Sequence, residues 1–397
     1  MTHGNNKFIS NPFVLYGVTW LCVILVYQLE WSYLPPKLTT GYILFFAITI
    51  SISFLFGLIT HKRKIFIYRP LTVIDFRIAK KFLYILWGMF LFEIIAARDI
   101  PLLSYLLGNR EKEYTDFGLA FVHVLVVNGF TILILYTYYG YRSINNRQIK
   151  RKCIKYLLLS ALPFALMFNR GGLMFGVLGC LIIYLMSTRN VAKVLIKIMT
   201  LIIGILFIFG ALGNLRTDVA GAKNLLLEFG EAKESFKESW IPSEFFWSYI
   251  YIATPLANAQ LMVNKGENIE PTASSYRDFI CFELMPEIIA KRISSETMHR
   301  QEKDLIFPAF NVCSVYGRTY KYLGWWGPIF MFSFSIFFII VTVGLIPKKS
   351  PFYVLGVTEV CIITIMNLFD NMYVFMGLIP QPFILILLSH LYRNHEK

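Results

Sequence analysis

The chain has 397 residues, of which 56% are hydrophobic, 17% aromatic and only 16% charged, and its formal net charge is +14. Soluble proteins carry about a quarter charged residues, whereas the apolar residues here collect in runs of about 15–22, the length that crosses a bilayer core of about 30 Å. This composition excludes a soluble enzyme, a fibrous protein and a disordered chain, and it predicts an all-α, polytopic membrane protein.

Ten apolar segments are expected to span the membrane as helices. They are, in chain order, Phe13–Leu29, Gly41–Thr60, Phe82–Ala97, Phe117–Tyr139, Cys153–Phe168, Gly171–Met186, Ile198–Leu212, Trp325–Ile346, Phe352–Phe369 and Tyr373–Tyr392. These segments define a seven-helix N-terminal membrane region over residues 1–212 and a three-helix C-terminal region over residues 325–397. Between them, residues 213–324 are expected to form one large exoplasmic loop, far longer than an ordinary connection.

The distribution of basic residues predicts the orientation of these helices. With both termini in the cytoplasm, the cytoplasmic loops hold 21 Lys and Arg against two acidic residues, and the opposite side holds 17 against 20. Lys and Arg near helix ends resist translocation, so this partition agrees with the positive-inside rule at every short loop. The net charge therefore records membrane orientation, and no nucleic-acid partner is indicated.

One part of the large loop is apolar enough to touch the membrane. Phe245–Val263 is rich in aromatic residues but is interrupted by Pro255 and Asn258. Counting this segment as a full span would invert the last three helices and place the basic loop at Lys348 outside, against the positive-inside rule. We therefore expect an interfacial or re-entrant helix.

Several kinds of chemistry have no motif in this sequence. No P-loop, no dinucleotide-binding glycine pattern, no H-E-x-x-H, no D-x-D pair and no C-x-x-C occurs, so neither a metal site nor a cofactor is expected. Cys281 and Cys313 share the large loop and could form a disulfide or remain buried thiols. The ionisable residues within the spans are chiefly Glu93, His123 and Glu359, which could be coupling sites of a transporter or could pair with polar groups on neighbouring helices.

Arg170 lies at the tip of a hairpin between two short predicted spans, so the tip is expected to be recessed below the exoplasmic surface. A guanidinium at this depth needs an anion or a wet cavity. Gly171 and Gly172 would leave room for a bulky group beside it, or would serve only to pack helices. Arg216 ends the next exoplasmic span, and the two arginines could grip a diphosphate, unless Arg216 simply pairs with Asp218.

The rest of the large loop is rich in polar and aromatic residues. One group supplies acids, bases and cations that would otherwise form a solvated face: Arg277, Asp278, Glu283, Arg292, His299 and Arg300. Another group lies close to the following span and suits sugar binding or an aromatic belt at the membrane interface: Asn311, Tyr316, Arg318 and Tyr320.

This pattern resembles the Wzy-type polymerases of bacterial O-antigen and related oligosaccharide repeat units. The features that carry the resemblance run through most of the chain: the Arg170-Gly171 hairpin, the exit at Gly213–Arg216, the segment Tyr251–Leu261, Leu284-Met285-Pro286, and the approach to a helix from Asn311 to Gly327. Relatives often place an acidic residue before the glycine that matches Gly324, whereas this chain has Tyr322-Leu323 there.

The resemblance implies a GT-C-like helical fold and a glycosyltransferase without metal or cofactor. Such an enzyme would sit in the bacterial inner membrane with its active site facing the periplasm. It would transfer a growing glycan from undecaprenyl diphosphate to an incoming lipid-linked repeat unit, with inversion, and a chain-length regulator would be a protein partner. Arg170 and Arg216 would stabilise the departing diphosphate. The general base that deprotonates the acceptor hydroxyl would be one of Asp218, Asp278, Glu283 and His299.

Three other functions remain open. An O-antigen ligase would share the exoplasmic loop and arginines and would use a loop histidine, for which His299 is the one candidate. A flippase or other transporter would need a polar path through the spans. An envelope acyltransferase is less well supported, because no His-Asp arrangement is evident.

Overall fold

The structure is a computed structural model that describes residues 5–107, 117–188, 190–218, 225–266 and 269–395. It is mostly helical, with one pair of two-residue strands, β1 (Asn5–Asn6) and β2 (Ile67–Tyr68). The N-terminal helices are α1 (Pro12–Tyr27), α2 (Thr40–Lys62), α3 (Phe76–Ala97), α4 (Pro101–Leu106), α5 (Ala120–Ser143), α6 (Arg147–Leu166), α7 (Arg170–Ser187) and α8 (Val191–Asp218). They are followed by α9 (Leu225–Phe229), α10 (Glu234–Lys237), α11 (Glu244–Lys265), α12 (Ala273–Phe279), a π-helix (Ile280–Leu284), α13 (Glu287–Ile293), α14 (Val315–Leu323), α15 (Trp326–Leu345), α16 (Tyr353–Met366) and α17 (Pro380–His395).

Each of the ten predicted apolar segments contains a helix in the structure, although the last, Tyr373–Tyr392, becomes helical only at Pro380. The mostly helical structure confirms the all-α class. Four of the described helices, α2, α5, α7 and α15, are long and apolar enough to cross a membrane. Several helices begin where a polar side chain caps the first turn. Asp75 accepts hydrogen bonds from two backbone N–H groups at the start of α3, and Asn11 precedes Pro12 at the start of α1. These caps mark where an apolar run turns helical.

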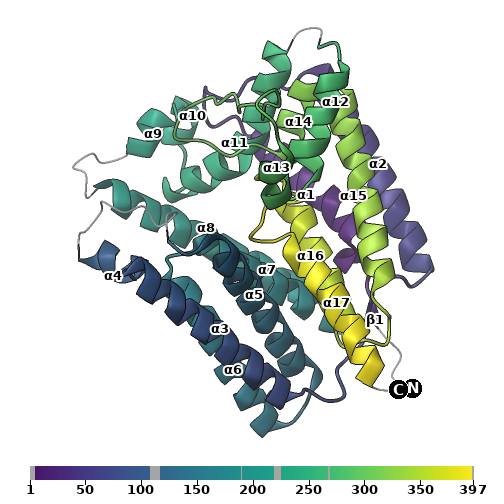
Figure 1. Ribbon diagram of the computed structural model, residues 1–397. Helices are drawn as coiled ribbons and strands as arrows, with labels where there is room; N and C mark the ends of the chain where they lie inside the picture. The colour runs from purple at the N-terminus through teal and green to yellow at the C-terminus, as the bar shows by residue number, and fades with distance from the viewer. Residues whose placement is uncertain (1–4, 108–116, 189, 219–224, 267–268, 396–397) are drawn as a thin grey trace.

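Loops assigned to the same side of the membrane lie together in the structure. At one end, Arg69 Nη1 donates to Lys348 O, and Lys348 Nζ donates to Lys64 O. The loops that carry these residues are both predicted to be cytoplasmic. At the other end, Lys303 of the large loop pairs with Asp370 of a predicted exoplasmic turn. Helices α9, α10, α12, α13 and α14 gather at this second end, at the top of the view (Figure 1), and we call it the cap end.

Helix α11 covers the segment for which an interfacial or re-entrant helix was expected. It is one continuous helix that contains Pro255 and packs against α1, α8 and α14. Its polar interruptions have partners inside the protein, since the fully buried Asn258 amide donates to Phe310 O and Val312 O. The apolar side chains of this segment therefore pack in the protein core. The same core joins helices from all three predicted regions.

The cysteines of the large loop do not form the disulfide that was one of two expectations. Cys281 and Cys313 are both buried and both free. The Cys313 thiol lies near the Met262 sulfur, and the Cys281 thiol lies near the Ala290 carbonyl oxygen. Both behave as small apolar side chains in the core.

Replacing Gly172 by alanine should destabilise the α6–α7 hairpin. A Cβ at Gly172 would lie 2.3 Å from the Phe164 ring, whereas a Cβ at Gly171 would meet only the Asn169 side-chain oxygen at 3.6 Å. Overpacking of this kind costs about 1–3 kcal/mol. We expect Gly172→Ala to lower the free energy of unfolding by this amount in detergent, and Gly171→Ala to change it little. Equal stabilities of the two variants would contradict the packing role of Gly172.

Candidate functional site

Arg318 on α14 is the centre of a buried ion network at the cap end. Its side chain is 9% exposed, and its Nε and Nη2 atoms lie 3.2 Å from Glu283 Oε1 and 3.0 Å from Asp370 Oδ1. Lys303 also pairs with Asp370, and the Asn371 amide donates to Glu283 Oε2 at 2.9 Å. The network joins α14, the π-helix and the turn between α16 and α17.

The two carboxylates of this network have opposite pKa shifts. Burial raises the pKa of Glu283, although Arg318 and Asn371 oppose the shift. Burial also acts to raise the pKa of Asp370, but Arg318 and Lys303 outweigh it, so the pKa is lowered. The guanidinium of Arg318 is thus compensated by two acids. Glu283 and Arg318, expected as a base and a substrate ligand, are both occupied within the protein.

Arg318→Met should therefore act on stability rather than on substrate binding alone. Removing one partner of a buried ion pair leaves an uncompensated charge and typically costs about 3–5 kcal/mol. Arg292 on α13 is exposed, and Arg292→Met should change stability by less than about 0.5 kcal/mol. Chemical unfolding of the two purified variants checks this difference, and an Arg318→Met protein of unchanged stability would contradict the stabilising role of the ion network.

A second ion cluster forms around Asp304. Its carboxylate lies 3.1 Å from Lys265 Nζ of α11 and 3.0 Å from Lys321 Nζ of α14. Burial acts to raise the pKa of Asp304, but Lys321 and Lys265 outweigh it and lower the pKa below the usual 3.8. The cluster fastens the segment after α13 to two helices.

The lowered pKa of Asp304 gives stability a defined pH dependence. A carboxyl whose pKa is depressed by folding contributes stability above its unfolded pKa, and this contribution is lost as the pH falls through the folded value. We therefore expect the melting temperature to fall as the pH drops below about 4. Asp304→Asn should lower the melting temperature at pH 7 and flatten the acid dependence. Parallel melting curves for the two proteins from pH 7 to pH 3 would contradict this expectation.

The structure distributes the other predicted loop residues over separate contacts. Arg277 Nη2 pairs with Asp278 at 2.9 Å, and Asp278 also accepts from the backbone N–H of His299, whose side chain is exposed. Tyr316 is fully buried, and its hydroxyl lies 2.7 Å from that of Tyr16. These residues make contacts that stabilise the cap end, and they do not line one common cavity.

The remaining predicted residues also lie apart from one another. The Tyr320 hydroxyl donates to Gly266 O, and Asn311 lines a separate, largely apolar pocket of about 380 Å³ beside α9 and α11. Arg216 and Asp218 end α8, and their side chains lie outside the described part of the structure. The two-arginine clamp therefore stays a prediction.

Arg170 is the first residue of α7, and the turn before it is well defined. Asn169 caps the helix by accepting from Gly172 N at 2.9 Å, and Phe168 adopts a left-handed backbone with φ of 56°. The Arg170 guanidinium carbon lies 4.6 Å from the centre of the Phe168 ring, which Tyr105 stacks against. Arg170 is exposed and has no carboxylate partner in the described part of the chain. It can therefore receive an anion.

The residues on both sides of Arg170 line a pocket of about 320 Å³. We call it the hairpin pocket. Its walls come from the start of α5, the α6–α7 turn and the turn before α17, and they include His123, Asn169, Gly171, Phe175 and Phe375. The turn before α17 also reaches the cap end, because Val374 O accepts a hydrogen bond from Glu287 N at the start of α13. A pocket of this size and mixed lining is of the kind that holds part of a small ligand.

His123 brings an acid–base pair to the wall of the hairpin pocket. Its Nδ1 atom lies 3.4 Å from Oε1 of Glu93 on α3, in an ion-pair contact, and its side chain is 28% exposed. Glu93 is fully buried, and the same oxygen accepts from Leu119 N at 3.1 Å. A carboxylate that holds one ring nitrogen leaves the other available as a base, and such contacts often tighten when substrate binds.

Gly118 makes the close approach of His123 and Glu93 possible. Its φ is +101°, and a Cβ there would lie 2.5 Å from His123 Nδ1 and 2.8 Å from Glu93 Oε1. A residue with a side chain would be strained and would push the pair apart.

From the sequence, Glu93 could be either a coupling site of a transporter or a partner of a polar group on a neighbouring helix. The structure pairs it with His123. Glu359, by contrast, is fully buried on α16, and its carboxyl oxygens have no hydrogen-bond partner among the described residues.

Comparisons of the chain with known protein families, with characterised proteins and with solved structures find no significant match.

Proposed function

We propose that the chain is a glycosyltransferase that polymerises undecaprenyl-diphosphate-linked oligosaccharide repeat units at the periplasmic face of the bacterial inner membrane. The observation that carries the proposal is the hairpin pocket. It is lined by His123, which pairs with Glu93, and by Asn169 and Gly171, which flank Arg170, a guanidinium without a carboxylate partner in the described chain. An anionic leaving group and an acceptor hydroxyl need these two kinds of residue.

Each residue has a separate role in the proposed transfer. Arg170 would bind the donor diphosphate through two parallel N–H···O bonds and stabilise the negative charge that grows on it as the glycosidic carbon–oxygen bond breaks. The acceptor hydroxyl oxygen would form the new bond to the anomeric carbon from the opposite side. Its proton would pass to His123 Nε2, and Glu93 would stabilise the resulting imidazolium through Nδ1. The products would be the lengthened glycan and lipid diphosphate.

The membrane arrangement proposed here has ten spans, a GT-C-like helical fold and both termini in the cytoplasm. The ten helices and the contacts between loops of the same predicted side support it. In this arrangement the starts of α5 and α7 face the periplasm, where lipid-linked glycans are polymerised. The bilayer and a chain-length regulator would be the partners.

Gene deletion followed by electrophoresis of the surface glycan tests the proposed function. We expect the ladder of long chains to disappear while one repeat unit still reaches the lipid core, because the monomer would be transferred but not polymerised. Complete loss of glycan from the core would point instead to a ligase or a flippase. An unchanged ladder would overturn the proposal.

A further inference from the structure

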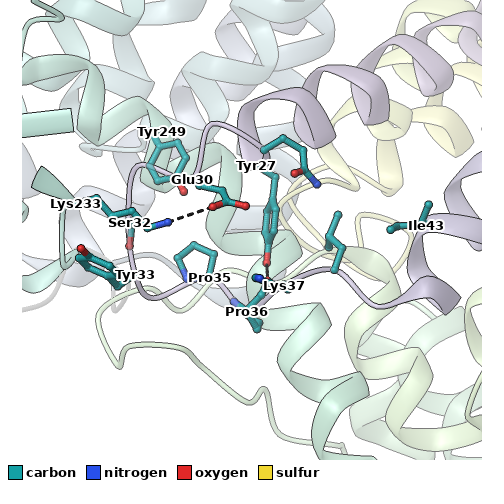
Figure 2. Close-up of a pocket in the computed structure, with 12 residues that line it drawn as sticks. Tyr27, Glu30, Ser32, Tyr33, Pro35, Pro36, Lys37, Ile43, Lys233 and Tyr249 are labelled. Carbon is teal, nitrogen blue, oxygen red and sulfur yellow. Dashed lines mark hydrogen bonds and ion pairs between the residues drawn. The ribbon is translucent and has the colours of Figure 1, made fainter. Parts of the chain in front are cut away.

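A second pocket, of about 490 Å³, lies at the cap end and shares no lining residue with the hairpin pocket. We call it the loop pocket. Its walls are the α1–α2 connection, from Tyr27 to Leu38, together with Ile43 of α2, Lys233 before α10 and Tyr249 of α11 (Figure 2). Tyrosine, proline, carboxylate, ammonium and amide groups all face it. No residue of this pocket was singled out from the sequence.

The walls of the loop pocket are held by backbone contacts between distant segments. Ser32 and Ala232 form an isolated antiparallel bridge, and beside it Tyr33 N donates to Glu231 O at 3.0 Å and Lys233 N donates to Trp31 O at 2.8 Å. The pocket is therefore formed before any ligand arrives, which lowers the entropic cost of binding.

The aromatic and charged groups in the loop pocket suit carbohydrate rather than a bare anion. Tyr33 is 64% exposed, with Lys233 Nζ 5.4 Å from the centre of its ring. Glu30 Oε2 lies 3.2 Å from the same Lys233 nitrogen, so one of the two lysines that line the pocket is already compensated. A sugar ring presents hydroxyls that bond with carboxylate, amide and ammonium groups, and an apolar C–H face that packs against tyrosine.

The backbone at Glu30 adds a separate observation. Its φ is 50°, three residues after the end of α1, in the left-handed region where glycine is the residue of lowest cost. Glu30 thus keeps a side chain at a backbone position that disfavours one, and that side chain points toward Lys233 in the pocket (Figure 2). Strain of this kind concentrates at binding sites.

We infer that the loop pocket binds sugar rings of the lipid-linked glycan, away from the bond that is being made. Tyr33 is the stacking surface, and Glu30 and Gln28 bind hydroxyl groups. The inference rests on the proposed function for the identity of the glycan. Leu38 and Ile43 place one rim of the pocket at the start of α2, which lies at the bilayer surface in the proposed topology, within reach of a glycan whose anchor is in the membrane. Binding of a non-reacting part of the substrate supplies energy for positioning the reacting part.

Saturation-transfer NMR on the full-length protein in nanodiscs tests the inference. The probe is the oligosaccharide released by mild acid from the host cell's own lipid-linked repeat units. We expect Tyr33→Ala and Glu30→Gly each to raise its Kd about tenfold or more, and Glu30→Gly to keep the melting temperature because glycine suits that backbone. Tyr84→Ala is the matched control, since Tyr84 is 62% exposed and has Lys80 at the same 5.4 Å from its ring, on α3.

The outcomes separate the pocket from the proposed function. The carbohydrate site would be overturned if both loop-pocket variants bound the oligosaccharide with wild-type affinity. It would also be overturned if an equal concentration of inorganic pyrophosphate displaced the oligosaccharide. Either result would hold even if gene deletion abolishes the long glycans. Selective loss of binding in Tyr33→Ala and Glu30→Gly would support the site even if deletion leaves the ladder unchanged, a result that would overturn only the polymerase.

Discussion

Replacing His123 by glutamine is expected to lower the rate of glycan polymerisation by about 10²–10⁴-fold, the contribution usually made by a positioned general base. Glutamine retains polar atoms of similar reach but cannot accept and hold the acceptor's proton. The ring is partly exposed, so the variant should fold normally. The rate is measured with purified protein in nanodiscs and lipid-linked repeat units, and the melting temperature is recorded beside it.

Two further variants make this prediction specific to the pair. Glu93→Gln should also slow the reaction, because a neutral amide stabilises the imidazolium less well than the carboxylate 3.4 Å from Nδ1 does. His390→Gln is the control, since His390 is exposed on α17, at the predicted cytoplasmic end. Normal polymerisation by both His123→Gln and Glu93→Gln would remove the pair from the mechanism.

The helical part of the fold was predictable because its causes are local. The apolar run that begins after Asn11 places the start of α1, Pro12, within one residue of the predicted Phe13. Helix α3 begins at Phe76, before the predicted Phe82, because Asp75 caps a first turn that carries charged residues outside the apolar run. Helix α11 was harder to predict. Its apolar residues could have faced lipid or protein, and only the packing of α1, α8 and α14 around it decides between the two.

The candidate site was less predictable because its contacts are non-local. Glu93 and His123 lie on different helices, and their approach depends on the unusual backbone of Gly118 between them. Arg318 looked like a cation available for substrate because its partners, Glu283 and Asp370, are distant in sequence. A sequence shows which charges exist, whereas pairing decides which of them remain able to bind a ligand.

Arg170→Ala should abolish long glycan chains without lowering the amount of protein in the membrane. Removal of one donor to a developing oxyanion costs about 10²–10³-fold in rate, and a charged donor to a diphosphate should reach at least this range. Arg170 is exposed at the first position of α7, so alanine should not disturb the helix. The readout is the surface-glycan ladder together with the polymerisation rate in nanodiscs.

Arg170→Lys and Arg98→Ala decide whether charge alone explains the effect. Lysine keeps the charge but cannot donate two parallel bonds to a diphosphate or stack as a plane on Phe168, so it should restore only a small part of the rate. Arg98 follows α3 at the same end of the molecule and is also exposed, and its loss should leave the ladder intact. Full activity of Arg170→Lys would reduce the role of Arg170 to general electrostatic attraction, and a normal ladder from Arg170→Ala would remove the hairpin from the reaction. Bidentate binding is therefore tested separately from charge, because a guanidinium held against an aromatic ring presents its donors in a fixed plane and an ammonium does not.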